Sequence, residues 1–208
     1  MLINNLGSLK AELSRYLFHQ RFAPDYDTAV QFFEAVANRR LRVRSMESMT
    51  NLTTVDGVAA LPTDYLVWRT VKNGSRPYMP ELDYVHPAYL PPTVSLAGTP
   101  LTYAPIVFTI EGNNFITRPT VDSTVWEFHY YQKIPSINGS DINSNWLITD
   151  YPDFYLFGTL TELAAMQRNA EMAQLYKARR DEVMAEIIQL QALTTGATSP
   201  MMRTGEYY

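Results

Sequence analysis

The sequence predicts an α+β protein: a helical bundle from N- and C-terminal helices, with an inserted small antiparallel β domain and an extended C-terminal tail. Apolar residues recur at helical spacing near both ends of the chain, whereas short alternating runs separated by turn residues fill the middle. Neither pattern continues at the extreme C-terminus. We therefore expect N-terminal helices in 1–48, the β domain in 49–148, C-terminal helices in 149–193 and the tail in 194–208.

Two helices are expected before residue 48, with a break at Pro24. Proline restricts the residue before it, and Asp25 or Asp27 can cap the helix that follows. Phe32 and Phe33 are adjacent in that second helix and cannot both face one neighbour. The helix is therefore predicted to meet protein on two sides, with both rings as candidate interface residues.

The middle region predicts strands at 65–71, 106–110, 115–118 and 125–131. Asp56-Gly57 and Glu111-Gly112 are predicted tight turns. His129 alternates with Phe128 and Tyr130, so we expect its side chain on the opposite face of its strand. Residues 82–105 are rich in proline and predict a long irregular connection.

Helical spacing returns at Asp150, where Thr149 or Asp150 can cap and Pro152 suits a first turn. One predicted apolar face comprises Phe154, Phe157, Leu160, Leu163 and Ala164, and a second comprises Met172, Leu175, Tyr176, Arg179, Val183, Ile187 and Leu190. Residues 167–169 are either a tight turn between two helices or a polar interruption of a single long one.

Composition excludes several kinds of chemistry. The chain has 208 residues and no cysteine, so thiolate zinc sites and iron–sulfur clusters are excluded. Its net charge of −4 argues against tight nucleic-acid binding, which usually leaves a basic footprint. Charged residues make up 18%, below the roughly 25% of typical domains, while there are 14 tyrosines. This composition favours a surface that contacts other proteins.

No catalytic, metal or cofactor site is predicted. His19, His86 and His129 have no second ligand at metal spacing, and no glycine-rich phosphate loop is present. Acid–base catalysis by carboxylates remains open, with a general acid such as Glu12 or Glu34 in the case of a hydrolase. The candidate carboxylates are Glu12, Glu34, Asp64, Glu81 and Asp83.

Two segments are candidate contact sites. The basic run, comprising Arg39, Arg40, Arg42 and Arg44, either contacts DNA phosphate or an acidic partner, or complements a helix C-terminus and is solvated. The tail ends in residue types that are enriched in interfaces, and we expect partner docking through Met201, Met202, Arg203, Tyr207 and Tyr208.

The order of several motifs resembles the head-to-tail adaptor proteins of short-tailed bacteriophages. The motifs are Phe32-Phe33-Glu34-Ala35, Arg40-Leu41-Arg42-Val43-Arg44, Ala60-Leu61-Pro62-Thr63-Asp64-Tyr65-Leu66, Phe108-Thr109-Ile110-Glu111-Gly112-Asn113, Tyr130-Tyr131, Asn145-Trp146-Leu147 and Tyr151-Pro152-Asp153-Phe154-Tyr155-Leu156-Phe157-Gly158. The likeness spans about residues 30–176.

This resemblance implies a structural, non-enzymatic role in the virion neck, with assembly in the host cytoplasm. Such adaptors form a ring, usually of twelve copies, that joins the portal protein to the tail nozzle or tube, where tail fibres are further partners. Genomic DNA passes through the ring without sequence-specific contact, and the C-terminal segment grips the portal. No cofactor and no membrane contact is implied. Two alternatives remain open, a tail-associated cell-wall hydrolase and a host glycan-binding β module.

Overall fold

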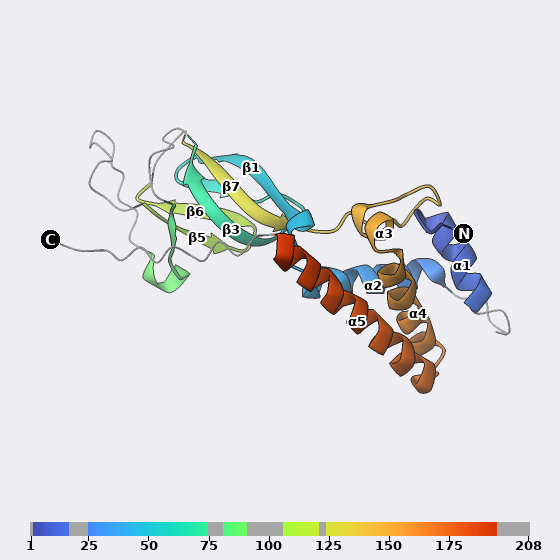
Figure 1. Cartoon of the computed structure of the whole chain (residues 1–208). Coiled ribbons are helices and arrows are strands. Elements are labelled where there is room, and N and C mark those ends of the chain that lie inside the picture. Colours follow the sequence, from blue (N-terminus) through green and yellow to red (C-terminus); the bar gives the residue numbers. More distant parts are fainter. Residues whose placement is uncertain (1, 17–24, 75–80, 91–105, 121–123, 195–208) are drawn as a thin grey trace. The chain divides into compact units, whose positions relative to one another are not determined.

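A computed structural model describes residues 2–16, 25–74, 81–90, 106–120 and 124–194 (Figure 1). The described residues form two compact units: a helical unit, up to Ser45 and again from Ile134, and a β unit, Met46–Lys133. The α+β class with helices from both ends is confirmed. Residues 134–148, expected in the β domain, belong instead to the helical unit, because Ile137 and Leu147 are buried there and the Ile134 amide donates to the Asn38 side chain at 2.8 Å.

Helix α4 lies at the centre of the helical unit. The α-helices within the described residues are α1 (Leu6–Tyr16), α2 (Tyr26–Arg40), α3 (Trp146–Asp150), α4 (Pro152–Met166) and α5 (Ala170–Thr194). Helix α4 packs against each of the other four. Its side chains are therefore buried on nearly every side, as expected for a helix that is apolar all round.

Three predictions about helix ends have clear outcomes. Asp25 caps α2 as expected, accepting from the Thr28 amide at 3.0 Å. Residues 167–169 separate α4 from α5, so the tight turn is confirmed and the single long helix is wrong. The predicted cap at Thr149 or Asp150 is also wrong, because both residues lie inside the short helix α3 and the residue at the N-cap of α4 is Tyr151.

The buried face of α5 differs in part from the predicted one. Tyr176 and Ile187 are buried as expected, together with Arg180, which was not expected. Leu175 and Leu190, expected on the buried face, are 54% and 52% exposed. At about 1.5 Å per residue, α5 is longer than α4 by roughly 15 Å, so α4 is too short to cover the end of α5 that carries Leu190.

The β unit contains two sheets rather than one. Strands β1 (Glu47–Thr53), β7 (Val125–Gln132) and β3 (Tyr65–Asn73) form an antiparallel sheet in that order. The second sheet has the order β2 (Val58–Ala60), β6 (Asn114–Arg118), β5 (Val107–Glu111) and β4 (Asp83–Tyr84). Strand β4 runs parallel to β5, which departs from the purely antiparallel domain that we expected.

Aromatic side chains form the core between the two sheets. Phe115 of β6 lies against Phe128 and Trp126 of β7, with ring centroids 5.6 and 6.5 Å apart. All three are fully buried. The Asp56-Gly57 turn is confirmed: both residues have positive φ, and Val55 and Val58 exchange two hydrogen bonds of 2.9 Å.

Candidate functional site

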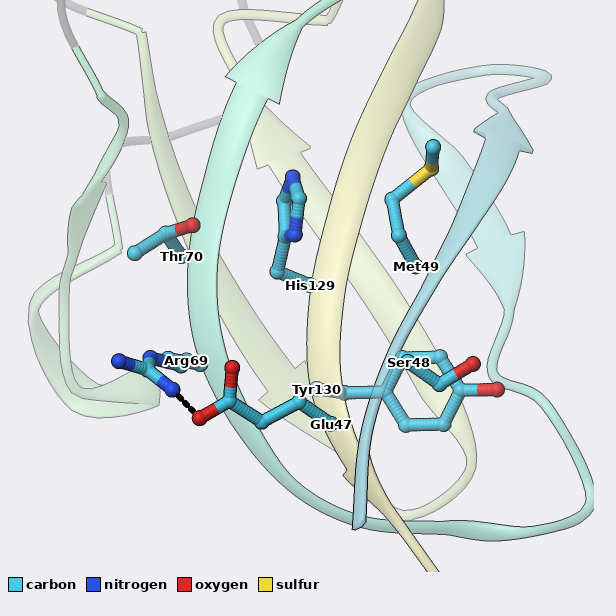
Figure 2. Close-up of a pocket in the computed structure, with 7 residues that line it drawn as sticks. All are labelled: Glu47, Ser48, Met49, Arg69, Thr70, His129 and Tyr130. Carbon is cyan, nitrogen blue, oxygen red and sulfur yellow. Dashed lines mark ion pairs between the residues drawn. The ribbon is translucent and has the colours of Figure 1, made fainter. Parts of the chain in front are cut away.

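The outer face of the three-stranded sheet carries a shallow groove of about 230 Å³ (Figure 2). Strand alternation places Phe128 in the core and His129 on the outer face, as predicted from the sequence. His129 lies opposite Met49 of β1 and Thr70 of β3 in the strand register. The groove is lined by Glu47, Ser48, Met49, Arg69, Thr70, His129 and Tyr130.

An ion pair between the two outer strands closes one end of the groove. The register of β3 against β7 shifts between Trp68 and Thr70, which leaves Arg69 as the extra residue. Its guanidinium lies 5.9 Å from the centroid of the Tyr131 ring on the central strand and pairs with Glu47 of the opposite strand. The ion pair therefore spans the central strand, and its contact with the Tyr131 ring helps to hold both groups on the sheet.

The groove combines an imidazole, an ion pair and an exposed methionine. Met49 is 53% exposed. Tyr130 directs its hydroxyl away to Asp64, to which it donates at 3.1 Å, and burial raises its pKa. Among the described residues, no carboxylate bonds to His129 and no group of acidic and histidine side chains is arranged to hold a metal ion. The imidazole and the ion pair offer hydrogen-bond donors and acceptors, which are the groups that would contact a polar partner surface.

The basic run lies at the end of α2 and in the residues that follow it. All four arginines are exposed. Arg40 pairs with Asp181 of α5 at 3.1 Å, and Asp181 also accepts from the buried Arg180 at 2.8 Å. Arg42 donates to the Asn38 carbonyl at 2.7 Å, near the helix C-terminus. Arg39 and Arg44 make no such contact within the described residues, so they remain available to a partner.

Phe32 and Phe33 have different environments. Phe32 is 50% exposed. Phe33 is fully buried, with its ring centroid 5.0 Å from the rings of both Phe154 and Tyr155 of α4. The expected role of Phe33 at a surface between copies is therefore corrected, because its ring fills the core of its own chain.

A family model described as SU10 adaptor protein matches residues 4–204 of the chain. The chain belongs to this family. A comparison with curated proteins found no match. As an SU10 adaptor, the protein is a structural component of the phage virion neck that interacts with portal and tail proteins.

The carboxylate of Glu34, one of the candidate general acids, is buried in a hydrogen-bond network of the adaptor. It is 6% exposed and accepts from the Ile137 amide at 2.9 Å and the Tyr155 hydroxyl at 3.1 Å. Asn145 also donates to the Tyr155 oxygen, at 2.7 Å. This network joins α2, α4 and the segment before α3, and sequence spacing gave no signal for it.

A second candidate carboxylate belongs to Glu12, which pairs with Arg15 one turn along α1 at 2.9 Å. This is a common surface arrangement in helices.

The expected docking residues of the adaptor lie outside the described residues; they are Met201, Met202, Arg203, Tyr207 and Tyr208. Within the part of the chain that is described, no helix is long and apolar enough to span a bilayer.

Proposed function

We propose that the adaptor forms a ring, of twelve copies, between the portal and the tail nozzle or tube, and that this ring lines the DNA conduit. The proposal rests on the family, and the observation that carries it is the distribution of exposed apolar side chains on the helical unit. Phe32 of α2 and Leu190 of α5 are each about half exposed. A ring of identical subunits needs two different surfaces that meet head to tail.

The charge of the chain is compatible with a DNA conduit. The net charge is −4, and residues 51–150 hold five basic against nine acidic side chains. An acidic or neutral wall lets phosphate pass without strong attachment. Arg39 and Arg44 are the groups of the basic run that are free to meet DNA or an acidic partner.

The C-terminal segment is proposed to dock on the portal. Its methionines, arginine and tyrosines are residue types enriched in interfaces, and it follows directly on α5. We further propose that assembly takes place in the host cytoplasm, with tail fibres among the later partners.

Ordered assembly tests the proposed function. Purified adaptor is incubated with portal oligomers, and purified tail nozzle is added before or after it. We expect the nozzle to be retained on the portal only when the adaptor is present. Retention of the nozzle on bare portal, or a portal that does not bind the adaptor, would contradict the proposal.

The glycan-binding alternative depends on exposed aromatic rings, and the described residues of the β unit offer Tyr84 and Tyr89. Tyr84 is 41% exposed and stacks on Trp68, with ring centroids 5.5 Å apart, and Tyr89 is 80% exposed. The variant Tyr84→Ala with Tyr89→Ala should lose binding to host cells if this alternative holds. The variant should still bind the portal as well as the wild type does, which would show that a loss of cell binding is not caused by a loss of the adaptor function.

A further inference from the structure

Two exposed helix faces of the helical unit are complementary in charge and in apolar character. The α2 stripe consists of Phe32, Ala35 and Arg39, which are three to four residues apart and all exposed. The α5 stripe consists of Glu182, Glu186 and Leu190, which are four residues apart and also exposed. Each stripe therefore has an apolar anchor at one end and charge at the other, positive on α2 and negative on α5.

Each stripe lies on a side of its helix that is not in contact with the rest of the same chain, in the part that the structure describes. On α2, Phe33 and Ala37 face the core, so Phe32 and Arg39 lie on the opposite side of the helix. On α5, Asp181 pairs with Arg40 of α2, whereas Glu186 lies five residues further on, about 140° around the helix. The α5 stripe therefore faces away from α2 of the same chain, and the two stripes cannot cover each other within one copy.

The spacing along the two helices also matches. Phe32 and Arg39 are seven residues apart, which is about 10 Å along a helix. Measured from Leu190, Glu186 lies at about 6 Å and Glu182 at about 12 Å. If Phe32 packs on Leu190 in an antiparallel crossing, the long side chain of Arg39 falls between the two carboxylates.

The charges within each stripe support this register. Glu182 already pairs with Arg179 at 3.0 Å, whereas Glu186 has no ion pair within the described residues. Arg39 likewise has none. With Phe32 on Leu175 in a parallel crossing, Arg39 would instead lie beside Glu182, which already pairs with Arg179.

We propose that the occupant of the α5 stripe is the α2 stripe of a second copy of this chain, with Phe32 on Leu190 and Arg39 beside Glu186. This inference rests on the proposed ring, and it names the surfaces through which neighbouring copies meet. The contact is heterologous, because each copy offers α2 to one neighbour and α5 to the other. Such a contact builds a ring when the rotation between neighbouring copies closes, as the proposed function requires, rather than a closed pair.

A charge swap tests the contact in the full-length protein, alone and on the portal. Arg39→Glu and Glu186→Arg should each weaken assembly by about tenfold or more, because like charges then face each other. The variant that carries both changes should assemble nearly as well as the wild type. Glu111→Arg, an exposed site in the β unit with the same change in net charge as Glu186→Arg, is the matched control and should assemble normally.

Cysteine cross-linking gives a second measurement, since the chain has no cysteine of its own. Ala35→Cys and Glu186→Cys are made as separate proteins. In the proposed register the two sites lie about 4.5 and 6 Å along their helices from the paired anchors. Mixing the two proteins under mild oxidation should yield a dimer that contains one chain of each, while neither protein alone should cross-link.

The outcomes separate this inference from the function on which it rests. Wild-type protein that forms no ring with or without portal contradicts the proposed function. If the wild type assembles while both single charge variants assemble equally well, only the inferred contact is overturned. Weakened single variants without recovery in the double variant would overturn it as well, as would cross-linking of either cysteine protein with itself.

Discussion

Replacing Gly158 with alanine probes the packing of α2 on α4. Gly158 lies in the interior of α4, where alanine would ordinarily stabilise a helix by about 1 kcal/mol. Here a Cβ would lie 2.0 Å from two ring carbons of Phe33. Phe33 cannot easily move, because it is fully buried and flanked by the rings of Phe154 and Tyr155.

Steric overlap should therefore outweigh the gain in helix propensity. Overpacking of a core costs about 1–3 kcal/mol, and an overlap this close belongs at the upper end of that range. After subtracting about 1 kcal/mol for propensity, we expect Gly158→Ala to lower the free energy of unfolding of the helical unit by about 2 kcal/mol. For a unit of this size, that corresponds to a fall in Tm of about 8 °C or more.

Thermal and denaturant unfolding, followed by far-UV circular dichroism, measure the change. Ala178→Gly, at an exposed position in α5, calibrates the propensity scale and should cost about 1 kcal/mol. Combining Gly158→Ala with Phe33→Leu should cost less than the sum of the two single changes, because the smaller side chain makes room for the methyl group. A Gly158→Ala protein that is more stable than the wild type would refute the reasoning.

Four further predictions concern the buried network around Glu34, the Tyr155 hydroxyl, the C-terminal tail and the basic run. Glu34→Ala should lower the stability of the helical unit by about 3 kcal/mol in urea unfolding, because two buried donors lose their acceptor, whereas Glu34→Gln, which keeps an acceptor oxygen, should cost less. Burial raises the pKa of Tyr155 above its usual value of about 10, so the unfolded state ionises first and stability should fall as the pH rises above about 10. Tyr155→Phe should flatten that alkaline decline, and an unchanged slope would assign it to other groups. Removal of residues 199–208 should leave thermal unfolding unchanged and weaken co-sedimentation with the portal, while undiminished co-sedimentation would exclude the tail from docking. Replacement by glutamine of Arg44, the arginine of the basic run that the inferred contact does not use, should reduce DNA retention in a filter-binding assay without affecting assembly, whereas a loss of assembly would assign Arg44 to protein contacts.

Local signals in the sequence were sufficient for many of the elements. Asp25 follows a proline and precedes a helical pattern, so its capping role could be predicted from neighbouring residues alone. The Asp56-Gly57 turn and the outward side chain of His129 depend only on turn chemistry and strand alternation. These features need no knowledge of distant parts of the chain.

Features that depend on tertiary contacts were missed or misassigned. Phe32 and Phe33 are indistinguishable by type, and only the approach of α4 at Gly158 decides which ring is buried. Helical spacing predicts Leu190 on the buried face of its helix, but α5 is longer than α4, and Leu190 is exposed. Glu34 was considered as an acid because a carboxylate in a sequence does not reveal the buried donors that surround it.

The candidate surfaces divide in the same way. The basic run was visible as a cluster of like residues, yet its division into Arg40, which pairs with Asp181, and Arg39, which does not, required the fold. The groove around His129 combines three strands that are far apart in the sequence. No spacing rule within one segment would have placed Glu47 beside Arg69.

The mass of the native complex between the adaptor and the portal tests the central claim most directly. Native mass spectrometry is carried out on the portal alone, on the full-length adaptor alone and on their mixture. The account predicts one complex in the mixture, whose added mass is a whole ring of adaptor chains, twelve for the proposed stoichiometry. An adaptor that remains monomeric and adds no mass to the portal would contradict the account.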